Sequence, residues 1–164
     1  MKGLQKEFNS LLVFTICCLL LVSCQTTDLF EKTATVPAQQ WKTSYKPSFT
    51  FEIKDTTAAY QLYITFRHND KYSFNNLWVN LYTLSPDKQQ AKAQYELPLA
   101  NNEKGWLATG MDDIYEHRIA LTPLNQDFRF GKAGLYTFTL EHIMREDPLM
   151  NVLNVGLRIE KKSR

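Results

Sequence analysis

Residues 136–141 read Tyr-Thr-Phe-Thr-Leu-Glu, so that an apolar side chain is followed by a polar one three times in succession. Successive side chains of a β-strand point to opposite faces, and this alternation predicts a strand with one buried face. Six further segments show the same period. They contain Phe49-Phe51-Ile53, Leu62-Ile64-Phe66, Leu77-Val79-Leu81, Tyr95-Leu97-Leu99, Tyr115-His117-Ile119-Leu121 and Val155-Leu157-Ile159. Seven strands are therefore expected after Pro47.

The segments between these strands carry turn residues instead of helical stripes. Examples are Asn69-Asp70, Ser85-Pro86-Asp87, Asn101-Asn102 and Asp147-Pro148. Only residues 88–96, which are good helix formers, could form a short turn of helix. Strands without intervening helices predict an all-β fold with a single antiparallel β-sandwich, jelly-roll or immunoglobulin-like, over residues 47–164.

Residues 1–23 have the features of a bacterial lipoprotein signal peptide. Lys2 and Lys6 precede an uncharged, mostly apolar run over residues 11–22. This run is shorter than the roughly 20 residues that a transmembrane helix needs. It ends in Leu21-Val22-Ser23-Cys24, which resembles a lipobox. We therefore expect cleavage before Cys24 and lipidation of its sulfur, so that inserted acyl chains hold the protein to the membrane.

Composition excludes several classes of function. The chain has 19 Lys and Arg against 17 Asp and Glu, a net charge of +2 without long runs of one sign, so a nucleic-acid-binding surface is not expected. All three cysteines lie at or before position 24, which excludes disulfides and thiolate metal sites from the mature domain. After removal of the leader, 17 basic and 16 acidic residues remain. Lipid insertion, not charge, is therefore expected to hold the protein to the membrane.

Residues 24–46 are expected to be the lipidated N-terminus and a tether. This stretch is rich in Thr, Ala, Gln and Lys, and it has few large apolar residues. Leu29, Phe30 and Trp41 are the exceptions, and they could pin part of the stretch onto the domain. The remainder, residues 47–164, has the size of one domain.

The densest group of possible metal ligands is Asp112, Asp113, Glu116 and His117. On a strand, neighbouring positions such as Glu116 and His117 point to opposite faces, so only a loop could bring all four together. Solvated turn carboxylates are the preferred interpretation, and neither a metal nor another cofactor is expected. No spaced nucleophile or phosphate-loop motif is present in the mature region, and no catalytic residue is assigned.

Three aromatic residues are the strongest candidates for a binding surface. Trp78 and Tyr82 have the opposite parity to the apolar side chains of their strand, and Tyr63 has the opposite parity on the preceding strand. If the two strands pair, the three rings share the second face of the sheet. Exposed aromatic anchors are typical of protein interfaces, and sugars also stack on them. The alternative is that this face is buried under another sheet or the tether.

An ordered series of short motifs resembles the gliding-motility lipoprotein GldH family over nearly the whole chain. The motifs are Trp41, Phe-Glu-Ile-Lys-Asp at 51–55, Phe66-Arg67-His68-Asn69, Tyr72, Asn75-Asn76-Leu77, Gly105-Trp106-Leu107, Gly110, Gly134-Leu135-Tyr136, Met144-Arg145-Glu146-Asp147-Pro148-Leu149 and Val155-Gly156-Leu157-Arg158. The family has Arg-Asn where this chain has Arg67-His68-Asn69, which predicts a local bulge. The resemblance implies a membrane-bound lipoprotein needed for the gliding machinery, with no known enzyme activity.

Among these motif residues, Arg67 and Arg145 are added to Tyr63, Trp78 and Tyr82 as candidate partner- or glycan-binding positions. Both arginines lie at predicted strand ends or loops, where functional side chains concentrate. The alternative role is turn-fixing hydrogen bonding.

These observations lead to one main functional hypothesis and two alternatives. The main hypothesis is a lipid-anchored, non-catalytic component or assembly factor of the gliding-motility machinery, on the outer membrane facing the periplasm, with other motility proteins as partners. The first alternative is a carbohydrate-binding surface or periplasmic lipoprotein that uses Tyr63, Trp78 and Tyr82. The second is a metal-assisted hydrolase built on Asp112, Asp113 and His117.

Overall fold

The computed structural model describes residues 29–162, in which every long element is a strand. The predicted signal peptide and Cys24 lie outside this range. Within it, the only helical element is the three-residue 3-10 helix η1 (Pro37–Gln39), and no helix is long and apolar enough to span a membrane.

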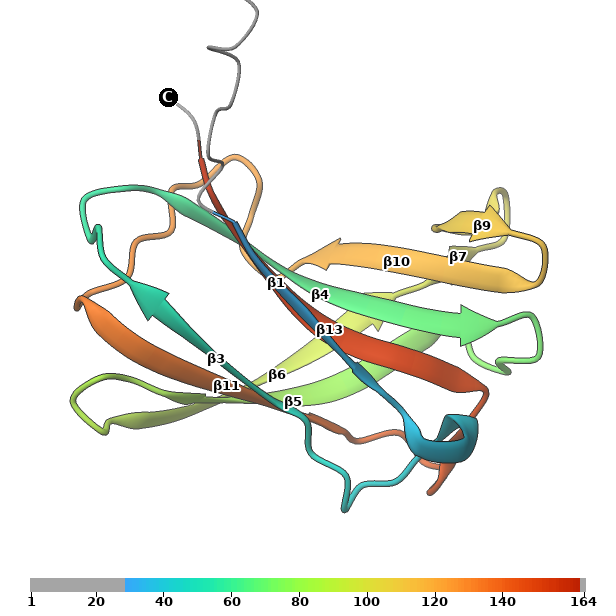
Figure 1. The fold of residues 1–164 in the computed structure, drawn as a ribbon. Coiled ribbons are helices and arrows are strands. Elements are labelled where there is room, and N and C mark those ends of the chain that lie inside the picture. The colour runs from blue at the N-terminus through green and yellow to red at the C-terminus, as the bar shows by residue number, and fades with distance from the viewer. Residues whose placement is uncertain (1–28, 163–164) are drawn as a thin grey trace, which may run out of the picture.

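Nine of the strands form two antiparallel sheets that pack face to face (Figure 1). The first sheet has the order β1-β13-β4-β10-β9. Its strands are β1 (Leu29–Thr35), β13 (Val152–Lys161), β4 (Tyr60–Asn69), β10 (Ile114–Ala120) and β9 (Thr109–Met111). The second sheet has the order β3-β11-β5-β6. Its strands are β3 (Ser48–Ile53), β11 (Gly134–His142), β5 (Asn76–Leu84) and β6 (Gln90–Pro98).

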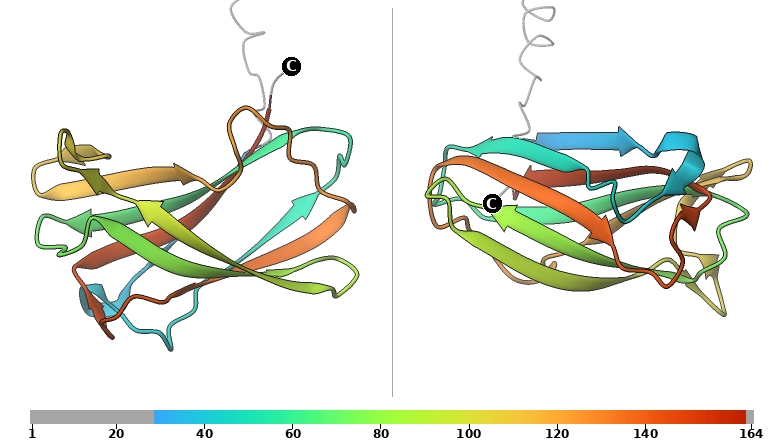
Figure 2. Two further views of the ribbon diagram at one scale, coloured as in Figure 1. Left: turned by 180° about the vertical axis from the view of Figure 1, so that it is seen from behind. Right: turned by 90° about the horizontal axis from the view of Figure 1, so that it is seen from below.

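Two small ribbons lie near the end of the sandwich where β4 finishes and β13 starts. One pairs β2 (Gln40–Trp41) with β12 (Leu149–Met150), and the other pairs β7 (Ala100–Asn101) with β8 (Gly105–Trp106). The two views of Figure 2 show the five-stranded and four-stranded layers from behind and from below. The predicted all-β antiparallel sandwich is therefore confirmed.

The core lies between the two sheets and follows from the alternating pattern. In β3 the side chains alternate strictly between exposed and buried, with Phe49, Phe51 and Ile53 inside. The ring of Phe51 contacts four aromatic neighbours from both sheets and their loops. They are Phe30, Phe130, Tyr136 and Phe138. Burial of these apolar faces is the main term that stabilises the fold.

All seven predicted segments are strands, but residues 88–96 are not helical. From Gln90 onward they form β6, which pairs with β5 over nine residues. Helix propensity differs by only a few tenths of a kcal/mol between ordinary residues. Pairing along a neighbouring strand outweighs that preference.

The tether prediction is wrong from residue 29 onward. All seven residues of β1 pair with β13 at the edge of the five-stranded sheet. Val36 and Trp41 are buried, and the Trp41 indole N–H donates to the carbonyl oxygen of Tyr45 at 2.9 Å. The domain therefore includes this stretch from β1 onward, because Phe30, Val36 and Trp41 pack in or against the core.

The predicted irregularity near Arg67-His68-Asn69 is present, but the extra residue lies on the partner strand. The β4–β13 register shifts between Val152 and Asn154, opposite His68 and Arg67. The carbonyl oxygen of Leu153, within this bulge, accepts the backbone N–H of Val36 at 2.8 Å. The bulge thus connects the segment after β1 to the sheet.

Candidate functional site

The outer side of the four-stranded sheet carries a connected group of polar and aromatic side chains. We call it the polar face and define it by Lys46, Trp78, Asn80, Tyr82 and Glu141. Trp78, Asn80 and Tyr82 alternate with the buried residues of β5, and the β5–β11 register places Asn80 opposite Glu141. The predicted association of Trp78 with Tyr82 on one strand face is therefore seen.

Glu141 is the centre of this face. Its Oε2 accepts hydrogen bonds from Asn80 Nδ2 at 3.0 Å and from the Tyr82 hydroxyl at 2.5 Å. Its Oε1 forms an ion pair with Lys46 Nζ at 2.6 Å. The hydrogen bonds from Lys46, Tyr82 and Asn80 lower the pKa of Glu141 to about 2. The carboxylate is therefore ionised throughout the neutral range and holds three side chains in place.

Asn80 has one polar atom that these contacts leave unused. Its side chain is 5% exposed, and among the described residues its Oδ1 has no hydrogen-bond partner. A buried acceptor without a partner is costly, and because this atom is shielded from solvent it is not itself a contact point for another molecule. The neighbouring Trp78 is fixed through its backbone, because its N–H donates to Met144 Sδ at 3.1 Å.

Tyr63 does not belong to the polar face, so the predicted cluster of three aromatics is wrong. Tyr63 lies on β4 in the five-stranded sheet, opposite Ala120 on one side and Arg158 on the other. β4 and β5 follow each other in the chain but lie in different sheets. The chain crosses between the sheets after Asn69, and this crossing separates Tyr63 from Trp78 and Tyr82.

The outer side of the five-stranded sheet is dominated by ion pairs. Arg67 on β4 binds Glu116 on the neighbouring β10. Arg158 on β13 bridges Glu31 on β1 and Glu160 on its own strand. Arg67 thus lies within a strand, not at its end.

Arg145, the other candidate arginine, is exposed in the loop between β11 and β12. That loop follows the four-stranded sheet, so the two candidate arginines belong to separate surfaces.

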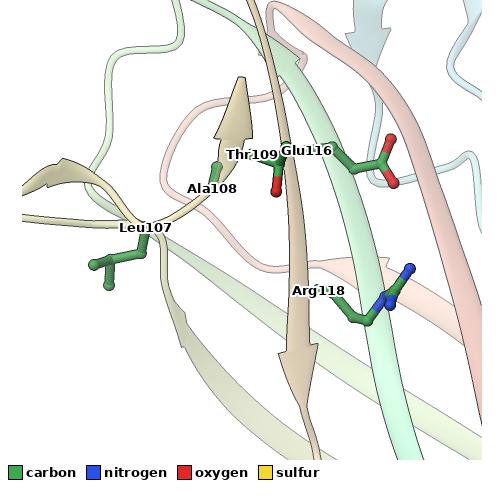
Figure 3. Close-up of a pocket in the computed structure, with 5 residues that line it drawn as sticks. All are labelled: Leu107, Ala108, Thr109, Glu116 and Arg118. Atoms are coloured by element: carbon green, nitrogen blue, oxygen red, sulfur yellow. The ribbon is translucent and has the colours of Figure 1, made fainter. Parts of the chain in front are cut away.

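An open hollow lies where the five-stranded sheet meets the segment between β8 and β9. It is lined by Leu107, Ala108, Thr109, Glu116 and Arg118. Figure 3 shows Glu116 and Arg118 extending from β10 across β4, whereas Leu107 points away on the other side. The side chains do not converge on one point. The hollow therefore lacks the geometry of a catalytic centre.

The four residues considered as metal ligands do not form a site. Asp112 and Asp113 are exposed in the turn between β9 and β10, while His117 is fully buried. Glu116 points to the opposite side of β10 and binds Arg67. Across residues 29–162 no group of three or more His, Cys, Asp or Glu side chains is placed to hold a metal ion.

Three residues of the polar face, Lys46, Asn80 and Glu141, are not among the sites predicted from the sequence. Asn80 could have been found, because it lies two residues from both Trp78 and Tyr82 and shares their parity. Glu141 and Lys46 are distant in sequence, and only the β5–β11 register and the loop before β3 bring them to Tyr82.

Comparison with known proteins identifies the family. Residues 28–159 match the family described as GldH lipoprotein. The chain belongs to the GldH lipoprotein family. The match spans all but a few of the described residues, so the whole sandwich, including β1, is the family's domain.

Two relatives in the GldH family match along almost their full length. A protein of Flavobacterium johnsoniae named "Gliding motility lipoprotein GldH" is 26% identical over 157 residues, covering 92% of this chain and 95% of the relative. A protein of Christiangramia forsetii named "Gliding motility lipoprotein GldH homolog" is 23% identical over 159 residues, covering 93% and 95%.

Solved structures give only a distant likeness. The VP2 subviral particle of infectious bursal disease virus aligns with 84% of this chain and 34% of the viral chain, at 11% identity and a TM-score of 0.35. A likeness of this size has no bearing on the function of the GldH family.

Proposed function

We propose that this protein is a lipid-anchored, non-catalytic component of the gliding-motility machinery, located on the outer membrane and facing the periplasm. The observation that carries the proposal is the family match over residues 28–159, which covers the complete sandwich. The two relatives bear gliding-motility names. The polar face and the ion-paired outer side of the five-stranded sheet both offer groups that could bind a partner.

The proposed anchor is a lipid on Cys24. The lipobox-like Leu21-Val22-Ser23-Cys24 motivates it. Acyl labelling of the wild type and of Cys24→Ser in a bacterial host tests it. The variant is expected to accumulate as unprocessed precursor without label. Normal labelling of Cys24→Ser would refute the anchor.

The proposed partner-binding surface is the polar face. Trp78 and Tyr82 provide large, rigid contact areas, and Glu141 and Lys46 provide charges that are already fixed in position. Interfaces concentrate binding energy in such aromatic anchors surrounded by polar groups. Because Trp78 and Tyr82 are only partly exposed, they are supported from the side and need little ordering when a partner binds.

In-cell cross-linking in a gliding host, followed by mass spectrometry of the proteins recovered from solubilised membranes, tests this function. The wild type is expected to recover other motility proteins, and Trp78→Ala is expected to reduce that recovery at least about tenfold, as for a central interface aromatic. Tyr63→Ala is the matched control, because it removes a half-buried aromatic from the opposite sheet. Equal losses in both variants would contradict the assignment of the surface, and recovery of no motility protein by the wild type would contradict the function.

A second candidate function is carbohydrate binding by the same face. It is favoured by the partly exposed Trp78 and Tyr82 rings beside the fixed Glu141 carboxylate, because sugars combine a stacking face with hydroxyl donors. Glycan-array binding that is lost in Trp78→Ala and kept in Tyr63→Ala would support it. An array without binding by the wild type would exclude it in favour of the motility role.

A further inference from the structure

The strand β6 is an unprotected edge of the four-stranded sheet. Among the described strands it pairs with β5 alone, and all five residues of its first half, from Gln90 to Gln94, are exposed. Figure 2 shows β6 along the rim of this sheet. An edge of this length presents backbone groups that can pair with another strand.

The hydrogen-bond alternation shows which backbone groups point outward. The Ser85 N–H donates to the carbonyl oxygen of Gln89 at one end of the β5–β6 pair, and the Leu99 N–H donates to that of Asn75 at the other. In an antiparallel pair, hydrogen-bonded and non-bonded residue pairs alternate. The two bonded pairs, Ser85 with Gln89 and Asn75 with Leu99, flank β6 directly on either side. Since bonded pairs recur at every second residue, the odd-numbered residues of β6 are the ones that bond to β5. The N–H and C=O groups of Gln90, Lys92, Gln94 and Glu96 therefore point away from β5.

The sequence of β6 is complementary to itself in the antiparallel direction. The strand has nine residues, and Gln94 is the middle one. A two-fold axis that sets Gln94 opposite Gln94 of a second copy places the two strands side by side over their full length. In this register Lys92 lies opposite Glu96 of the second copy, and Glu96 lies opposite Lys92. Outward-facing residues meet outward-facing residues, so the backbone ladder can form from Lys92 to Glu96, while at each end Pro98 has no N–H to donate to Gln90. Opposite charges directly across a ladder stabilise the pairing.

Both charged side chains are already held on the outer side of the sheet. Lys92 Nζ lies 5.3 Å from the centre of the Tyr82 ring. Glu96 Oε1 accepts a hydrogen bond from Asn76 Nδ2 at 2.8 Å. Both side chains lean toward β5 in the single copy, so each must turn across the edge to meet its counterpart.

The other edges of the two large sheets lack this property. Pairing β1 with itself over its full length places Lys32 against Lys32, which is repulsive. The six residues of β3 have no central residue, so full overlap places the buried Phe49 against Glu52. The fourth edge, β9, has only three residues.

We propose that β6 is a homodimer interface, in which two copies join their four-stranded sheets into one continuous antiparallel sheet. The contact is isologous, with the same residues contributed by both copies. It places both polar faces on the same side of the joined sheet. This inference rests on β6 alone and does not depend on the proposed role in motility.

A cysteine at the two-fold axis tests the register in the full chain. Gln94→Cys, extracted in detergent from the membrane of the producing host, is expected to form a disulfide-linked dimer on mild oxidation, since residues opposite each other in a ladder lie about 5.5 Å apart at Cα. The matched control is Gln90→Cys, on the same strand, whose counterpart is Pro98. The wild type shows whether the chain's own cysteines form a disulfide-linked dimer under the same oxidation. Dimer formation by Gln94→Cys alone supports the proposal, and equal or absent cross-linking of both variants overturns it.

Charge exchange tests the interface without cysteines. Lys92→Glu and Glu96→Lys each replace two attractive pairs by repulsive ones, and each is expected to raise the dimer dissociation constant about tenfold, as measured by light scattering in detergent. The double variant Lys92→Glu with Glu96→Lys restores the opposite charges and is expected to return to within about threefold of the wild type. A monomeric wild type at all concentrations, or a double variant as weak as the single ones, overturns the proposal.

Discussion

The imidazole rings of His68 and His117 face each other across β4 and β10, with their Nε2 atoms 2.9 Å apart. His68 Nδ1 lies 2.7 Å from the carbonyl oxygen of Asn69, so this nitrogen carries a proton and donates it. His68 Nε2 must then accept a hydrogen bond from His117 Nε2. This arrangement assigns one proton to each ring, and a second proton on His68 would abolish the bond, because both of its nitrogens would then be donors. Both are fully buried, and Trp106 packs against both.

The first prediction concerns the pH dependence of stability. Burial, followed by the charge that His68 would carry, lowers the pKa of His117 from 6.5 to about 4, and burial also lowers the pKa values of His68 and His142. The unfolded chain therefore binds protons first as pH falls. Stability is complete above about pH 6.5 and is lost progressively toward pH 4, with about 3 kcal/mol from His117 alone. Urea unfolding at pH 7.5, 5.5 and 4.5 measures this loss.

The variant His117→Gln provides the control for this prediction. Its amide N–H can still donate to His68, but it does not titrate. We expect its unfolding free energy to depend less steeply on pH between 6.5 and 4. The carboxylates with lowered pKa values, such as Asp87 and Glu141, lose their contribution only below about pH 4. A wild type whose stability is constant from pH 7.5 to 4.5 would contradict the burial of neutral histidines.

The second prediction concerns the N-terminal segment. Trp41→Ala is expected to destabilise the domain by about 3–5 kcal/mol, because the side chain is fully buried and its removal leaves a cavity against Leu149 and His142. Chemical denaturation gives the value. The neighbouring Lys42 is exposed, and Lys42→Ala should change stability by less than about 0.5 kcal/mol. If Trp41→Ala left the unfolding free energy unchanged, the segment before β3 would have to be interpreted as a tether.

The third prediction concerns a close approach between strands at Gly156. A Cβ atom at this position would lie 2.4 Å from Thr65 Oγ1 and 2.6 Å from the backbone oxygen of Lys32. The backbone cannot move without breaking the β1–β13 ladder, so Gly156→Ala should cost about 1–3 kcal/mol or more. At Gly131 nothing lies within 4 Å of the same atom. Gly131→Ala should therefore be close to neutral, and similar thermal shifts for both variants would count against the packing described.

The fourth prediction concerns the polar face. Glu141→Gln removes the charge that orients Lys46, Asn80 and Tyr82, and we expect a loss of about 1–2 kcal/mol in unfolding free energy. Glu52 lies on the same side of the same sheet, is exposed, and forms only a long ion pair of 3.7 Å with Lys54. Glu52→Gln is the matched control and should leave the unfolding free energy unchanged. Equal effects of the two substitutions would show that Glu141 does not organise the face.

Local alternation was sufficient to locate seven of the eight strands of six or more residues in the described range, because period two is imposed by the buried face of each strand. Phe49, Phe51 and Ile53 illustrate this, since each buries its side chain as predicted. Which strands are neighbours is a different question. Tyr63 and Trp78 are separated because the chain changes sheets between β4 and β5, and no property of the two strands taken singly specifies this crossing.

The residues of the polar face show the same limit. Trp78 and Tyr82 were found because they share a strand and a parity. Glu141 reaches them through the β5–β11 register, which joins segments about 60 residues apart in the chain. The N-terminal strand β1 was missed for a related reason. Its Glu, Lys and Thr residues are those of an edge strand with one solvated side, and in sequence they resemble a linker.

The early start of β1 determines how far the domain can extend from the membrane. With the proposed lipid on Cys24, only residues 25–28 separate the anchor from the sheet. Five residue steps of fully extended chain span at most about 17 Å, whereas a linker running to residue 46 would reach about 80 Å. With that anchor, the start of β1 would stay within the shorter distance of the lipid headgroups. A partner would then have to reach to within about one domain's length of the membrane surface.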